Sequence, residues 1–149
     1  SYDTRFLLRE TTPVVAVLTF WGVVSSILHS QLFLAGLLMA LLYTVDRGST
    51  FAESYQSPSR STDTRGVLRE NVRVAVPAGF WALLSQLVAP LLLVSTICSG
   101  YAQEIVETAL SGIALGLNWG GVAVVLLYVI AVGVPRVRAL VAESSAVDD

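Results

Sequence analysis

Long uncharged apolar stretches constrain this chain more than any other feature of its sequence. Residues 13–45 form a run of 33 residues without a charged side chain, and polar residues interrupt this run at Ser25, Ser26 and 29–31. One helix over the whole run would be about 50 Å long, whereas the hydrocarbon core of a bilayer is about 30 Å thick. The run therefore predicts two membrane-spanning helices, over residues 11–28 and 31–45, joined by a tight turn near His29.

Two further apolar stretches predict two more spans. Residues 74–98 are uncharged, and residues 119–134 form a fourth apolar run that Pro135 is expected to end. Between them, apolar residues such as Ile105 and Ile113 recur at helical spacing, while polar residues fall largely on the other side. This pattern predicts an amphipathic helix over residues 100–117 that lies at the outer membrane interface.

Composition excludes several classes of protein. Charged residues make up 13% of the chain and hydrophobic residues 54%, whereas a soluble domain carries about 25% charged residues. The net charge of −2 provides no basic surface for nucleic acid. One cysteine and one histidine exclude an internal disulfide and a multi-histidine metal site, and no residue pattern predicts a cofactor. Nine arginines and no lysine are typical of GC-rich or halophilic prokaryotes and their viruses.

The distribution of basic residues predicts orientation. With four spans, all of them fall in the amino-terminal segment, the middle loop or the carboxyl-terminal tail, at positions 5, 9, 47, 60, 65, 69, 73, 136 and 138. Because basic loops stay in the cytoplasm, both termini are expected there. An alternative places a turn at Pro90 and gives five spans, but it would put Arg136 and Arg138 outside, which the charge rule disfavours.

The chain also resembles itself at an offset of sixty residues. Comparison of residues 3–28 with residues 63–88 gives ten identities in 26 positions, including the pair Phe-Trp at residues 20–21 and 80–81. This similarity predicts two parallel repeats, each a helical hairpin. The predicted fold is an all-α, polytopic four-helix bundle made of two such hairpins, with the amphipathic outer helix as an insertion.

The repeat sets the expected organisation of the chain. The first hairpin covers residues 1–45, and a Ser-rich cytoplasmic linker covers residues 46–62. The second hairpin covers residues 63–134 and includes the insertion at 100–117, and residues 135–149 form a cytoplasmic tail.

Few residues in the spans could carry chemistry. Ser25, Ser85 and Gln86 are polar residues within the expected spans, and they could line a solute path or bond to neighbouring helices. Trp21 and Trp81 lie halfway along their spans, where they could line a pocket or pack against a helix. The site residues proposed for packing or for a path are therefore Trp21, Ser25, Trp81, Ser85 and Gln86.

The arginine pairs Arg5/Arg9 and Arg65/Arg69 each share one helix face at the cytoplasmic boundary. They are candidate contacts for lipid head groups or other anions, and otherwise act as orientation anchors.

These features predict a non-enzymatic membrane protein that acts as an assembling structural or accessory subunit of a larger complex or envelope. Its expected partners are membrane lipids and either other membrane chains or further copies of itself. The alternative is a small oligomeric transporter or channel that uses the repeat interface as its solute path. The chain contains no nucleophile–base arrangement and no phosphate-binding loop, so it is not expected to be an enzyme.

Overall fold

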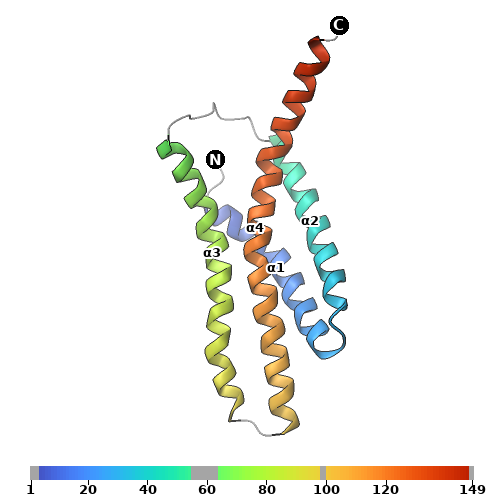
Figure 1. Ribbon diagram of the computed structural model, residues 1–149, viewed down its shortest axis with the longest axis vertical. Helices are drawn as coiled ribbons and strands as arrows, with labels where there is room; N and C mark the ends of the chain where they lie inside the picture. Colours follow the sequence, from blue (N-terminus) through green and yellow to red (C-terminus); the bar gives the residue numbers. More distant parts are fainter. Residues whose placement is uncertain (1–3, 55–63, 98–99, 148–149) are drawn as a thin grey trace.

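The computed structural model describes residues 4–54, 64–97 and 100–147, and these residues form an all-α structure. Its helices are α1 (Thr4–Ile27), α2 (Leu32–Ser54), α3 (Thr64–Ser95) and α4 (Tyr101–Val147). They run alternately down and up the molecule, so the amino-terminal ends of α1 and α3 lie toward the same end of the molecule as the carboxyl terminus (Figure 1). We call this end the arginine end.

All four helices are long and apolar enough to cross a membrane. Their outward faces carry large apolar side chains, and Leu42 and Leu93 are each at least 70% exposed. In water such a surface would be unfavourable, because each square ångström of exposed apolar area costs about 25 cal/mol. Length, composition and the apolar surface together indicate a multi-pass integral membrane protein.

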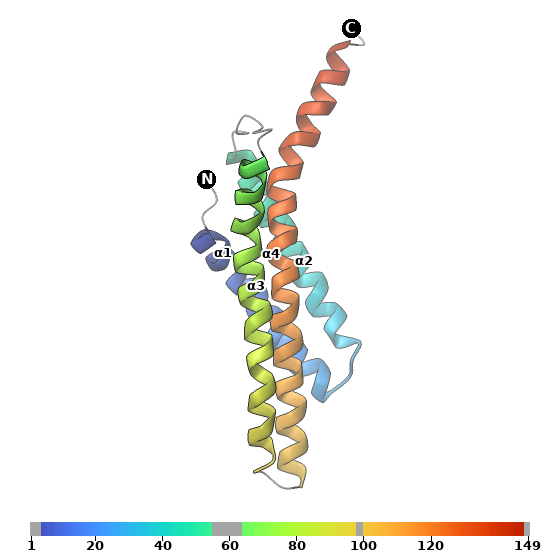
Figure 2. The ribbon, with the colours of Figure 1, turned by 60° about the vertical axis from the view of Figure 1, so that its left-hand side comes forward.

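The helices differ in length in a way that the apolar stretches did not predict. α4 contains 47 residues and is therefore about 70 Å long, more than twice the thickness of a hydrocarbon core. It extends beyond the other helices at the arginine end, and the α3–α4 turn lies below the α1–α2 turn (Figures 1 and 2).

Main-chain hydrogen bonds between residues three apart in the sequence stabilise the connection between α1 and α2. The amides of Leu32, Phe33 and Leu34 donate to the carbonyls of residues 29, 30 and 31, at 3.0–3.2 Å. Before α4, Gly100 has a φ of 66°, a conformation that costs glycine little and other residues more. Its carbonyl then accepts a hydrogen bond from the amide of Gln103.

α1 and α4 form the centre of the bundle, with α2 on one side and α3 on the other. One core cluster joins α1, α3 and α4 and includes Trp81 and Val124, whereas the second joins α1, α2 and α4 and includes Leu18 and Phe33. Among the described residues, α2 and α3 make no contact. A closed two-fold arrangement of two hairpins would need an α2–α3 contact matching the α1–α4 contact, so one chain does not form it.

The predicted amphipathic outer helix at 100–117 is wrong as a separate element. The first part of α4 contains these residues, and the helix continues into the predicted fourth span. Gly112 and Gly116 explain why, because they face α1 at backbone distance and hold this segment against the bundle. The polar side of the segment remains exposed at Glu104 and Glu107.

Two predicted helix ends are also wrong. Residues 46–54 of the predicted linker continue α2, where Arg47 forms an ion pair with α1. Residues 55–62 of that linker lie outside the described residues. α4 does not end at Pro135. A proline removes one helical hydrogen bond and bends a helix, and α4 leans away from the bundle toward its carboxyl end (Figure 2).

Pro90 lies inside α3, together with Pro77. The expectation of four spans rather than five is therefore supported, since the described residues contain four helices that meet the requirements for a span. Proline is tolerated in membrane helices because neighbouring groups satisfy the freed carbonyls.

Candidate functional site

The most specific polar contact in the bundle joins α3 to α1. The indole Nε1 of Trp81 donates to Oγ1 of Thr11 at 3.1 Å, and both residues are buried. The Thr11 hydroxyl in turn donates to the Leu7 carbonyl at 2.7 Å. The hydroxyl is therefore both acceptor and donor, and the indole has the partner that a buried tryptophan requires.

Trp21 and Trp81 each pack at a glycine on the second helix of their own hairpin. A Cβ on Gly36 would lie 2.4 Å from the Trp21 Cβ. A Cβ on Gly120 would lie 2.5 Å from a Val15 methyl group and 3.3 Å from the Trp81 ring. Since real Cβ atoms do not approach other atoms to 2.5 Å, these glycines leave the room that the packing requires.

Glycines also let the α1 and α4 backbones touch. A Cβ on Gly22 would lie 2.3 Å from the Gly112 carbonyl oxygen, and a Cβ on Gly116 would lie 2.4 Å from Cα of Thr19. Gly112 and Gly116 have the spacing of a small-residue motif that packs membrane helices, and here they pack against α1 of the same chain. In this contact the Thr19 hydroxyl is buried and has no hydrogen-bond partner.

Two glutamates near the arginine end connect the helices of each hairpin. Glu10 on α1 accepts a hydrogen bond from Nε of Arg47 on α2 at 2.8 Å. Glu70 on α3 accepts one from the phenol of Tyr128 on α4. The Arg47 guanidinium also lies over the Phe51 ring, 5.2 Å from its centroid.

Sequence reasoning missed both glutamate contacts, although it contained a signal for them. Glu10 and Glu70 are identical at equivalent positions of the sixty-residue offset. The offset did not reveal their partners, because Arg47 and Tyr128 do not align with each other at sixty residues.

The serines bond within their own helices. Ser25 donates to the Gly22 carbonyl at 2.9 Å, and Ser85 donates to the Ala82 carbonyl at 2.7 Å. Both residues are buried. Among the described residues no hydrogen bond joins the two serines. Gln86 is exposed on α3, unlike its neighbour Ser85.

The candidate anion contacts Arg5, Arg9, Arg65 and Arg69 are all exposed at the arginine end. Arg5 and Arg9 belong to α1, and Arg65 and Arg69 belong to α3. An ion pair at this end joins Arg47 to Glu10.

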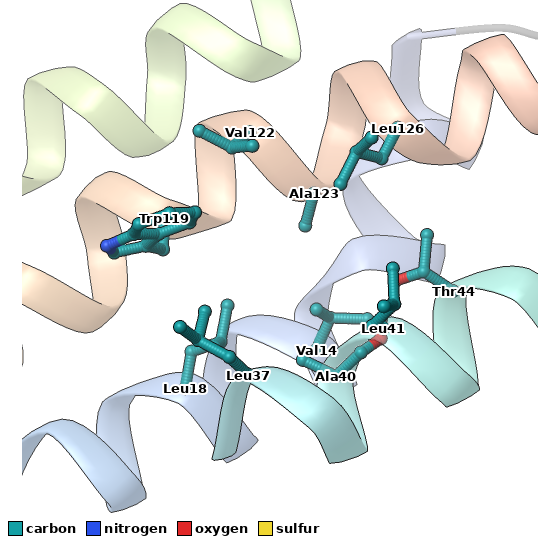
Figure 3. A pocket seen from close by; sticks show the side chains of 10 residues that line it. All are labelled: Val14, Leu18, Leu37, Ala40, Leu41, Thr44, Trp119, Val122, Ala123 and Leu126. Carbon is teal, nitrogen blue, oxygen red and sulfur yellow. The ribbon is translucent and has the colours of Figure 1, made fainter. Parts of the chain in front are cut away.

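An apolar groove of about 220 Å³ lies between α1, α2 and α4 (Figure 3). Trp119 lies at one end of this groove and Thr44 near the other (Figure 3). The Thr44 hydroxyl donates to the Ala40 carbonyl at 2.7 Å, so it presents no unused donor. The groove therefore has room for an apolar group, and its lining is apolar apart from the Thr44 hydroxyl and the Trp119 indole. Its lining comprises Val14, Leu18, Leu37, Ala40, Leu41, Thr44, Trp119, Val122, Ala123 and Leu126.

Neither Trp21 nor Trp81 lines this groove. Among the residues that the structure describes, no group of three histidine, cysteine or carboxylate side chains could hold a metal ion. His29 is exposed at the α1–α2 turn, where its Nδ1 accepts a hydrogen bond from the Gln31 amide at 3.3 Å.

Comparisons with protein-family models, with curated proteins and with solved structures gave no significant match.

Proposed function

We propose that this chain is a non-enzymatic subunit that assembles with other membrane chains or with copies of itself in a larger complex or envelope. One observation carries the proposal. Among the described residues, the buried side chains of Thr11, Ser25, Thr44 and Ser85 all donate to a main-chain carbonyl of their own helix, and only the buried Thr19 hydroxyl has no hydrogen-bond partner. A hydroxyl that bonds to its own helix has used its one donor, which leaves it little capacity to bind a polar solute.

The apolar outer surface supports assembly within the membrane. The exposed side chains of α2 and α3 include Leu38, Leu42, Leu83 and Leu87, each more than 60% exposed. Within this surface, the exposed small residues Ala75 and Ala89 of α3 suit the close packing by which membrane helices associate.

Duplication of the hairpin is part of the proposal, and equivalent contacts support it. Ser25 and Ser85 both donate to the carbonyl three residues earlier. Trp21 packs at Gly36, and Trp81 packs at Gly120, the residue before the one that corresponds to Gly36 in the comparison below. The second helices are also similar. At an offset of 85, five residues of 36–48 are identical to those of 121–133: Gly36, Leu41, Leu42, Tyr43 and Gly48 correspond to Gly121, Leu126, Leu127, Tyr128 and Gly133.

We propose the cytoplasmic side for the arginine end and thus for both termini. The described arginines lie on α1, α2, α3 and α4 toward this end, whereas Glu104 and Glu107 begin α4 at the other. This asymmetry is the one that the positive-inside rule describes.

Native purification tests the assembly proposal. Tagged protein, extracted in a mild detergent, should have a protein mass above that of one 15.9 kDa chain when light scattering separates protein from detergent. A solitary chain at every protein concentration, with no other chain bound, would contradict the proposal.

Liposome flux tests the transporter alternative, and the packing residues predict no flux. Ion or solute flux that Ser85→Ala reduces, and that the neighbouring exposed substitution Leu87→Ala leaves unchanged, would favour a polar path instead.

The orientation of the chain has a separate test. An impermeant maleimide should label Cys98, which lies outside the described residues, from the outer side. In a Cys98→Ser background, Ser144→Cys should be labelled only from the cytoplasmic side.

A further inference from the structure

Gln86 is an unusual residue for the bilayer-facing surface of α3. It lies at the midpoint of the uncharged residues 74–98, about 18 Å of helix from either end. Its side chain is exposed, and it makes no hydrogen bond within the described part of the chain. An amide carries two donor hydrogens and an acceptor oxygen, and burial in hydrocarbon without partners is unfavourable. The position therefore requires a partner from outside this chain.

The residues around Gln86 allow a helix to approach closely. Ala75, Gly79, Ala82 and Ala89 share its face of α3 at alternating spacings of three and four residues. A Cβ on Gly79 would meet no atom within 4 Å, and Ala75 and Ala89 are exposed. Spacing of this kind continues along one seam of a left-handed helix pair.

The equivalent face of α1 shows what such a face does in this fold. At the sixty-residue offset, Ala75, Gly79 and Ala82 correspond to Val15, Thr19 and Gly22. Those three α1 residues lie against Gly120, Gly116 and Gly112 of α4. α2 would be the matching helix for α3, but the described residues of α2 and α3 do not touch. The α3 face is thus the uncovered counterpart of a face that packs against a helix.

We propose that this face, defined by Ala75, Gly79, Ala82, Gln86 and Ala89, binds the same face of a second copy of the chain. The inference rests on the proposed assembly function and names its partner. Two copies inserted in the same direction place their Gln86 side chains at the same depth about a two-fold axis along the membrane normal. Each amide can then donate to the carbonyl oxygen of the other. A different partner chain would have to supply a polar group at that depth, whereas a second copy supplies it by symmetry.

Cysteine cross-linking in membranes maps the interface. In a Cys98→Ser background, Gly79→Cys, Ala82→Cys and Gln86→Cys should give disulfide-linked dimers on mild oxidation. The matched substitutions Phe80→Cys and Leu87→Cys change exposed positions on another side of α3 and should give little dimer. Equal yields at all five positions, or a maximum at Phe80 and Leu87, would overturn the proposal.

Affinity measurements test the amide itself. Gln86→Leu should weaken association about tenfold in fluorescence energy transfer between labelled chains in liposomes, as expected for the loss of hydrogen bonds between helices. Gln86→Asn should retain part of the affinity. Gly79→Leu should block close approach, while Gly133→Leu changes a glycine with equally open surroundings and should have no effect. Unchanged circular dichroism keeps folding separate from association.

The outcomes also separate this inference from the proposed function. If the protein purifies with other chains but Gln86→Leu has no effect, the α3 interface is wrong and assembly stands. If Gln86→Cys cross-links to a different protein, the second-copy assignment is wrong. If the wild-type chain is solitary in every assay, both proposals fail.

Discussion

The short distance between the α1 and α4 backbones predicts whether an added methyl group stabilises or destabilises the fold. We consider Gly112→Ala, which adds one methyl group where the helices cross. The added Cβ would lie 2.5 Å from the Gly22 carbonyl oxygen, 2.6 Å from its carbon and 2.7 Å from Cα of Val23. All three are backbone atoms, so no side chain can rotate away. The helices must separate, and α1 and α4 must lose packing along their whole contact.

The expected magnitude follows from two opposing contributions. Overpacking costs about 1–3 kcal/mol, and the upper part of this range applies because only backbone can move. Replacing a helical glycine with alanine recovers about 0.5–1 kcal/mol of conformational free energy. Gly112→Ala should therefore destabilise the fold by about 1–2 kcal/mol.

Gly133→Ala is the matched control. Gly133 is on the same helix, and a Cβ there meets nothing within 4 Å, so only the favourable contribution remains. Gly133→Ala should raise the free energy of unfolding by up to about 1 kcal/mol.

Unfolding in mixed micelles with increasing dodecyl sulfate, followed by tryptophan fluorescence and circular dichroism, measures both variants. The double variant Gly22→Ala/Gly112→Ala should be less destabilised than the sum of the single variants, because one separation of the helices relieves both clashes. If Gly112→Ala and Gly133→Ala change stability equally, the close α1–α4 contact is absent and the reasoning is refuted.

Two further predictions concern side chains. Thr11→Val leaves the Trp81 indole without an acceptor and should cost about 1–3 kcal/mol, whereas Thr19→Val removes a buried unpaired hydroxyl and should be neutral or stabilising in the same unfolding assay; equal losses would contradict the assigned hydrogen bond. Glu10→Gln breaks an ion pair with Arg47, whose side chain is 43% exposed, so the loss should stay below about 1 kcal/mol and shrink as salt is added. A larger, salt-independent loss would show that the pair is shielded from solvent.

Much of the helical framework was predictable because hydrophobic length is a local property. The uncharged residues 13–45 and 74–98 indicated where the chain crosses a membrane, and Pro90 does not divide the span in which it lies. Helix ends were less predictable. α2 continues past Asp46 and α4 continues past Pro135, since charged side chains and prolines limit apolar runs without ending a helix at a membrane surface.

The candidate site residues were also predictable only in part. The sequence singled out Trp21, Trp81, Ser25 and Ser85 by their position within spans, and the structure places all four in helix packing or in bonds within a helix. It did not indicate Thr11, because a hydroxyl near the start of a span gives no sign of what it accepts. The acceptor role depends on Trp81, which is seventy residues away in the chain.

The sequence by itself determined the number of spans, the segregation of arginines and the self-similarity of the chain, because these depend on side-chain chemistry along the chain. Only the tertiary structure decided that residues 101–117 join the fourth span, that Gly112 and Gly116 meet α1 rather than another chain, and that α2 and α3 stay apart. The physical reason is that a helix face lined with glycines lets any backbone approach closely and does not select which one. Which backbone approaches it depends on the relative height and tilt of whole helices, and no local pattern of residues encodes these.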